Sequence, residues 1–107
     1  MILAILIFNA LPEKRKELMQ TLLSMFEENG KEKGCLRYNI LTDIYETTVF
    51  NLIEEWNTRE DLNRYLRSER FSIILGTKSL LAVPMKIKIH SVSQTEGIDA
   101  VFNLRSQ

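Results

Sequence analysis

The first strand-length stretch of the chain, MILAILIF, restricts the possible folds more than any other feature of the sequence. Side chains in a strand alternate between the two faces of a sheet, and here both faces are apolar. Such a strand has to be covered on both sides. One face carries Ile2, Ala4, Leu6 and Phe8, and the other carries Met1, Leu3, Ile5 and Ile7.

A second strand is predicted within TTVFNLIEEW, residues 47–56. Phe50, Leu52 and Trp56 share one parity and the other parity is mixed, which is typical of a strand that leans on a core through one face. Glu54 falls on the apolar parity. Because a bare charge is costly to bury, its carboxylate needs a donor or a water-filled cavity. The region around Glu54 and Trp56 is therefore the first candidate for a site.

The remaining periodicities predict two helices and two further strands. One helix covers about residues 12–29, with Gly30 after its end, and another begins with a capping box at Thr58 and continues to residue 75. Strands are expected at 36–41 and 83–93, the latter an edge strand because it carries a proline and alternating lysines. The order β-α-β-β-α-β predicts an α+β, ferredoxin-like fold with an antiparallel sheet and two helices on one face.

Composition excludes several classes of function. The 107 residues form one domain, and 14 basic and 14 acidic residues give no net charge, so we expect neither a nucleic-acid nor a membrane partner. The N-terminal stretch lacks a basic leader and is too short to span a bilayer. The single Cys35 excludes a disulfide framework and a cysteine-based zinc site, and it suits a reducing cytoplasm.

With both helices on one side of the sheet, the other side stays uncovered. It includes Val49 and Ile53 together with the odd-numbered residues of the first strand. We expect a second copy to cover it, which makes the protein a homodimer. The tail, residues 95–107, carries further apolar residues and is expected to dock on the partner or across the sheet.

The motifs Gly34-Cys35-Leu36-x-Tyr38, Phe50-x-Leu52-x-Glu54-x-Trp56, Leu62 and Ser68-x-x-Phe71 resemble the antibiotic biosynthesis monooxygenase (ABM) domain of the dimeric α+β barrel superfamily. The resemblance spans about residues 1–92, within a domain placed at 1–94. It implies a homodimer with one pocket per protomer between sheet and helices. It also implies oxygenation of electron-rich phenols, anthrones or quinols without flavin or metal or, in a sister branch, oxidative haem breakdown.

Two positions depart from the family pattern. Tyr65 stands where many members have a histidine, and Leu75 stands where the haem-degrading branch has its axial histidine. A haem iron then has no obvious ligand, although Asn9 and Trp56 are similar to residues of that branch. The resemblance thus favours chemistry without a cofactor and leaves haem as the lesser alternative.

A cofactor-free oxygenase needs an apolar cavity, donors for a developing oxyanion and an acceptor for a proton. Asn9, Trp56 and Tyr65 are the candidate donors, and Glu54 is the candidate proton acceptor if burial raises its pKa. The cavity walls are expected to come from the substrate-binding set Tyr38, Phe50, Leu62 and Phe71. The substrate would be a small aromatic molecule.

Plainer interpretations remain open for these residues. The aromatic residues also suit an ordinary core, and Glu54 could pair with a backbone donor or an arginine. Cys35 fits a small core residue, and His90, on the lysine parity of its strand, fits a surface or interface position. The same pocket could also serve a binding or stress-related dimeric module without turnover.

Overall fold

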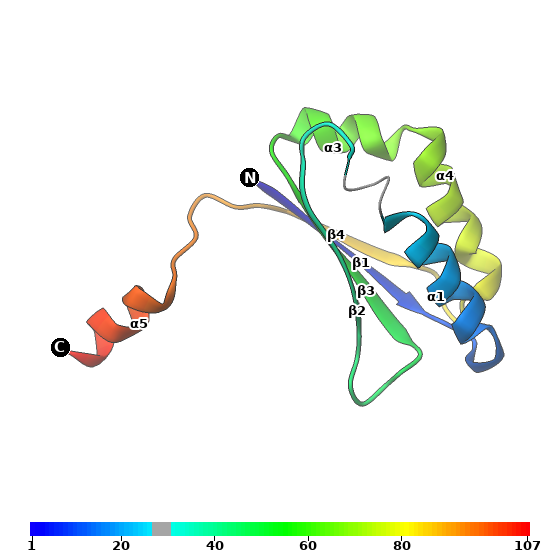
Figure 1. Ribbon diagram of the computed structural model, residues 1–107, viewed down its shortest axis with the longest axis horizontal. Helices are drawn as coiled ribbons and strands as arrows, with labels where there is room; N and C mark the ends of the chain where they lie inside the picture. The colour runs from blue at the N-terminus through cyan, green and yellow to red at the C-terminus, as the bar shows by residue number, and fades with distance from the viewer. Residues whose placement is uncertain (27–30) are drawn as a thin grey trace.

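The computed structural model describes residues 1–26 and 31–107. Within these residues four strands and four helices are described, with short 3-10 turns before α1 and after α4. Figure 1 shows their arrangement. The predicted end of the first helix near Asn29, and Gly30 after it, lie outside the described residues. The elements are β1 Ile2–Asn9, α1 Arg15–Ser24, β2 Cys35–Thr42, β3 Val49–Trp56, α3 Arg59–Leu66, α4 Glu69–Gly76, β4 Lys86–Ser91 and α5 Ile98–Arg105.

The strands form one antiparallel sheet in the order β2-β3-β1-β4. Helices α1, α3 and α4 lie over the same face of it (Figure 1). This arrangement confirms the predicted α+β, ferredoxin-like fold, and it confirms β4 as an edge strand. The strand that is apolar on both faces, β1, is one of the two inner strands and lies between β3 and β4.

Burial alternates along the two inner strands. On the helix-covered face of β1, Ala4, Leu6 and Phe8 have no exposed surface, whereas the intervening Leu3, Ile5 and Ile7 keep part of theirs. The side of the sheet that faces away from the helices, called here the open face, is thus apolar at its centre and half-buried. Because Ile5 pairs with Ile53 there, the open face continues onto β3.

The second predicted helix is divided into two. Helix α3 ends at Leu66, and α4 begins after Ser68, whose hydroxyl accepts a hydrogen bond from the backbone N–H of Phe71 at 3.2 Å and donates one to the carbonyl of Tyr65 at 2.6 Å. Ser68 therefore caps the second helix and fixes its direction. Gly76 ends α4, as the sequence predicts.

The motif glycine, Gly34, has a structural reason. Its φ angle is +84°, a conformation that residues with a Cβ rarely adopt. A Cβ there would also lie 2.1 Å from Oδ2 of Asp61, in the first turn of α3. The N-cap residue Thr58 accepts a hydrogen bond from the N–H of Asp61 at 3.1 Å, so the predicted cap is present. Gly34 lets the start of β2 approach this cap closely.

Candidate functional site

Three aromatic rings meet where β3 ends beneath α3 and α4. Trp56 stacks on Tyr65 with ring centroids 5.0 Å apart and planes at 30°. Tyr65 in turn contacts Phe71 edge-on at 5.4 Å. Each ring comes from a different element, and the three are at most 5% exposed. We call Trp56, Tyr65 and Phe71 the aromatic cluster.

Glu54 lies against this cluster, as its parity in β3 predicts. Its carboxylate is fully buried, and Oε1 accepts a hydrogen bond from the indole Nε1 of Trp56 at 3.3 Å. The other oxygen, Oε2, is buried without a partner that has full hydrogen-bond geometry among the described residues. A carboxylate held this way lacks the donors that normally offset its loss of water.

Burial raises the pKa of Glu54 from 4.5 to about 7, because an apolar environment disfavours the charged form. Hydrogen bonding from Trp56 and from Tyr65 acts in the opposite direction and lowers this pKa. The net result is a carboxyl group that changes charge near neutral pH. Such a group can both take up and release a proton under physiological conditions.

Two of the predicted wall residues, Tyr38 and Leu62, are buried on β2 and α3, the strand beside β3 and the helix that carries Tyr65. Tyr38 pairs with Glu54 across β2 and β3 and is only 6% exposed, and its ring meets that of Phe26 at 6.0 Å. Leu62 lies on α3 one turn before Tyr65 and is fully buried. Tyr38, Leu62 and Phe71 all belong to the buried core that contains Trp56 and Tyr65.

Phe50 lies elsewhere. It is buried on the same face of β3, but it pairs with Phe8 and Thr42, six residues before Trp56. At 3.4 Å per residue this separation is about 20 Å. The guanidinium of Arg15 lies over its ring at 5.2 Å, which makes Phe50 part of the other end of the core.

Asn9 is also not brought to the cluster. It pairs with Val49, whereas Glu54 pairs with Ala4, so the two lie about 17 Å apart along the strands. Asn9 shares the parity of Ile7, which turns its side chain to the open face, where it lines a hollow with Ile7 and Val83. Its expected place beside Trp56 and Tyr65 does not agree with this register.

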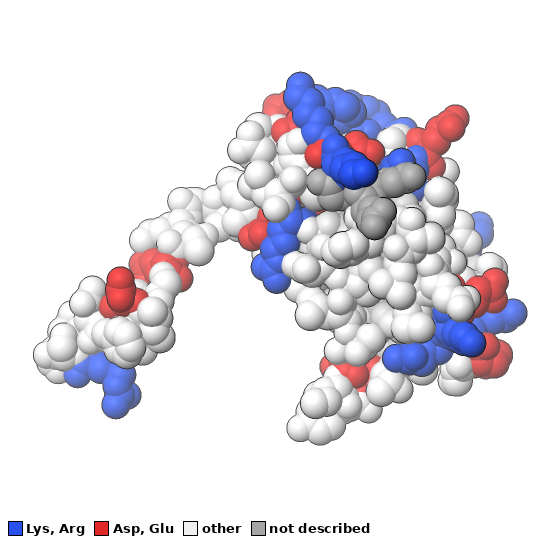
Figure 2. All heavy atoms as spheres, in the orientation of Figure 1, with Lys and Arg blue, Asp and Glu red and all other residues white. Residues whose placement is uncertain are grey.

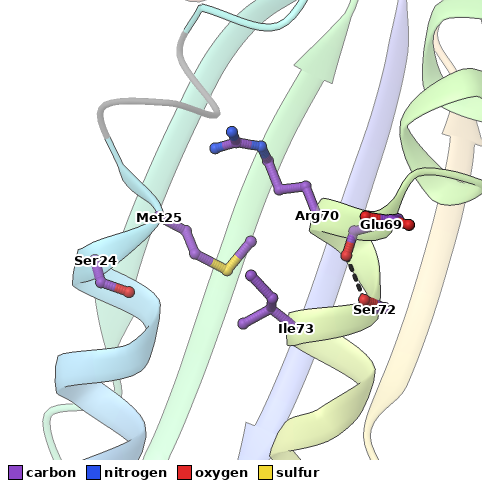
Figure 3. Close-up of a pocket in the computed structure, with 6 residues that line it drawn as sticks. All are labelled: Ser24, Met25, Glu69, Arg70, Ser72 and Ile73. Carbon is purple, nitrogen blue, oxygen red and sulfur yellow. Dashed lines mark hydrogen bonds between the residues drawn. The ribbon is translucent and has the colours of Figure 1, made fainter.

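A groove between α1 and α4 opens above the core (Figure 3). Its volume is about 550 Å³. Met25 and Ile73 approach each other across it, and Arg70 reaches toward the segment before β2 (Figure 3), where its Nε lies 3.4 Å from Oε1 of Glu32. Phe71, the outermost ring of the cluster, comes from the same turn of α4. The lining residues are Ser24, Met25, Glu69, Arg70, Ser72 and Ile73.

This groove was not predicted from the sequence. The only sequence signal for it is that Arg70 directly precedes Phe71 of the motif. Two residues that line the groove, Arg70 and Ser72, flank Phe71 in α4. Met25 belongs both to the groove and to the core that contains Trp56 and Tyr65.

The family model for antibiotic biosynthesis monooxygenases matches residues 1–73, more than half of the chain. The chain belongs to the antibiotic biosynthesis monooxygenase family. An uncharacterized protein from Synechocystis sp. is 28% identical over 88 residues, which are 81% of this chain and 60% of that protein. The chain therefore spans about 60% of the length of this relative.

Solved structures agree with the ABM fold. A conserved protein from Methanosarcina mazei is 28% identical, with a TM-score of 0.78 over 83% of this chain and 89% of that one. A protein from Deinococcus radiodurans is 22% identical, with a TM-score of 0.85 over 92% and 98% of the two chains. The similarity to the second structure establishes the fold alone.

The haem-degrading ABM branch needs an axial ligand that this chain does not offer beside Trp56. The single histidine, His90, lies on β4 opposite Leu3 and so faces the open side of the sheet. Leu75 is half-exposed on α4. Within residues 1–26 and 31–107, no three His, Cys, Asp or Glu side chains gather as metal ligands, and no helix has the length and apolar character needed to cross a membrane. The residues of the site do not fit haem.

Proposed function

We propose that this ABM protein is a monooxygenase that needs no cofactor and acts on a small electron-rich aromatic of the phenol, anthrone or quinol type. The observation that carries the proposal is Glu54, a fully buried carboxyl group with a pKa of about 7. It accepts a hydrogen bond from Trp56 and lies against the aromatic cluster. Family membership supports the reaction class.

The reaction begins with loss of a proton from the substrate, because the resulting anion is the form that reduces dioxygen. Glu54 accepts this proton, and its raised pKa makes it a stronger base than an ordinary carboxylate. The phenolic O–H of Tyr65 and the indole N–H of Trp56 hold the Glu54 carboxylate before the reaction. Once Glu54 is protonated it needs them less, and they turn to the developing oxyanion, which they stabilise more in a buried site than they would in water. One oxygen atom then enters the product and the other leaves as water, with the substrate as the source of the electrons.

Access runs through the groove between α1 and α4. Its 550 Å³ volume lies in the range of small-molecule sites. Met25 and Ile73 offer apolar contacts for an aromatic ring, and the Arg70–Glu32 ion pair lies at the rim. Movement of Phe71 would open the way from this groove to Glu54.

The protein is also proposed to act as a homodimer. The apolar centre of the open face, with Ile5, Ile7 and Ile53, keeps part of its surface exposed in one protomer. Removing that surface from water stabilises an association of two copies through their sheets.

Oxygen uptake by metal-stripped protein with a panel of hydroquinones and anthrones tests the proposed reaction. We expect turnover by the natural protein and a loss of about 100-fold in Glu54→Gln, in line with the usual contribution of a general base. Tyr65→Phe should be slower by about tenfold, because one donor is lost. Glu55→Gln, which changes the next carboxylate on the opposite face, is the matched control and should keep full activity. Equal rates in Glu54→Gln and the natural protein would remove Glu54 from the mechanism.

One observation favours a second candidate, a ligand-binding module without turnover. Glu54, Trp56 and Tyr65 are each at most 1% exposed, so the cluster is also well packed as a core. In that case the same panel would raise the melting temperature through binding, with no oxygen consumed.

A further inference from the structure

Helix α5 carries an apolar stripe that the protomer leaves exposed. Ile98, Val101 and Phe102 recur at the i, i+3, i+4 spacing of one helix face. They are 62%, 46% and 60% exposed, and α5 has no buried residue. A helix of eight residues is too short to be stable alone in water, so this stripe needs a surface to cover it.

The chain carries α5 away from its own domain. Residues 92–97 continue from the end of β4, and α5 lies apart from the sheet and the other helices (Figure 1). Most of this arm is uncharged on its visible side (Figure 2). The radius of gyration is 15.9 Å, whereas a compact domain of this length has about 13 Å. A connector of six residues reaches up to about 20 Å.

We propose that α5 docks on a second copy of this chain, in the groove between its α4 and the segment that leads into β4, so that two protomers exchange arms. The inference extends the homodimer proposed above. The groove has a volume of about 350 Å³, which has room for the ring of Phe102. It is lined by Ile74, Leu75, Thr77, Lys78, Leu81, Pro84 and Met85.

The ends of β4 explain why the acceptor is a second copy. The groove includes Met85, just before β4, whereas the arm leaves just after Ser91. These points are about 20 Å apart along the strand, and the arm leads away from the groove of its own protomer (Figure 1). In a two-fold symmetric dimer the β4 strands of the two protomers can run in opposite directions. The end of β4 from which the arm leaves one protomer then lies near the groove of the other. Symmetry then repeats the contact.

The areas favour the same occupant. The open face of four strands, each up to eight residues long, has a footprint of about 500 Å², while each partner of a stable complex buries about 800 Å². The footprint of α5 is only about 120 Å², so the arm is too small to cover the open face by itself. Each protomer would bury its open face, its own α5 and the groove that receives the α5 of the partner. Together these contacts bring the buried area of each protomer close to about 800 Å².

Charge is consistent with this docking. Lys78 is exposed at the groove, and Asp99 lies in the first turn of α5, beside the apolar stripe. Opposite charges at the edge of an apolar contact set its orientation more than its strength.

A disulfide between arm and groove tests the proposal. Phe102→Cys and Leu75→Cys are combined in a Cys35→Ser background; the first two positions are exposed, so the changes leave the fold intact. After oxidation, a denaturing gel without reductant should show a covalent dimer. The matched control replaces Phe102→Cys by Asn103→Cys, on the opposite side of α5, and should cross-link at least about tenfold more slowly.

The outcomes separate arm exchange from the dimer itself, which light scattering of the full chain measures. A disulfide within one chain, or no disulfide in a protein that is a dimer, overturns arm exchange and leaves the sheet dimer standing. A monomer by light scattering overturns both. Removal of residues 94–107 should raise the dissociation constant of the dimer by at least about tenfold, because the apolar anchors are lost. An unchanged constant contradicts arm exchange.

Discussion

The two faces of the sheet are made from the same strands, yet they give two neighbouring carboxylates different environments. Glu54 faces the helices, is fully buried and has a pKa raised to about 7. Glu55, the next residue, faces the open side, keeps part of its surface exposed and lies 4.0 Å from the guanidinium of Arg37. Strand parity alone separates them. Burial beneath α3 and α4 therefore turns one of two adjacent carboxylates into a candidate base.

Core truncations on the two faces should give the largest effect. Leu52 is fully buried, so Leu52→Ala should lower the free energy of unfolding by about 3 to 4 kcal/mol at every protein concentration. Ile53→Ala should cost less, and its cost should grow with protein concentration, because the second copy covers Ile53 only in the dimer. Urea denaturation at two concentrations a hundredfold apart measures both. A cost for Ile53→Ala that ignores concentration contradicts a covered open face.

Stability against pH gives the next largest effect. The folded protein holds the proton of Glu54 more tightly than the unfolded chain, so the stability that this group contributes is complete below pH 4.5 and is lost as the pH rises through about 7. The total loss from this group is about 3 kcal/mol. Denaturation series between pH 4 and 8 should show this slope, Glu54→Gln should remove it, and Glu55→Gln should keep it. A slope that survives in Glu54→Gln would assign it to other groups.

The smallest effect is expected for the ion pair on the open face. Arg37 is half-exposed and lies at the limit of contact with Glu55, so Arg37→Ala should change the free energy of unfolding by less than about 0.5 kcal/mol. The difference between Arg37→Ala and the natural protein should vanish when denaturation is repeated in about 1 M salt, because screening removes most of such a pair. A loss as large as that expected for Glu54 would show that the open face is more strongly coupled than its exposure indicates.

The sequence carries much of this comparison. Alternation in residues 47–56 predicts that Glu54 lies with Trp56 on the core face, and the structure confirms it. Alternation also predicts the face of Asn9, which shares the parity of Ile7, but its expected role as a donor rested on the family resemblance and on its place at the end of the first strand, not on this parity. Period-two registration decides the face of a strand residue more firmly than its distance from an end.

Other features depend on tertiary contacts that no local pattern encodes. The prediction ran one helix through residues 58–75, across the polar residues 67–70, and the break at Ser68 is shown by its capping hydrogen bonds. The groove between α1 and α4 arises where two elements distant in sequence meet, and Arg70 by itself gives no sign of it. Catalytic roles for Glu54, Trp56 and Tyr65 stay predictions until turnover is measured.

A direct titration of Glu54 tests the central claim most closely. The carboxyl carbon of ¹³C-labelled glutamate, assigned by comparison with Glu54→Gln, can be followed by NMR across the pH range in the full-length protein. The account predicts one glutamate with a midpoint near pH 7, missing in the variant. A midpoint for Glu54 near its ordinary value of 4.5 would contradict it.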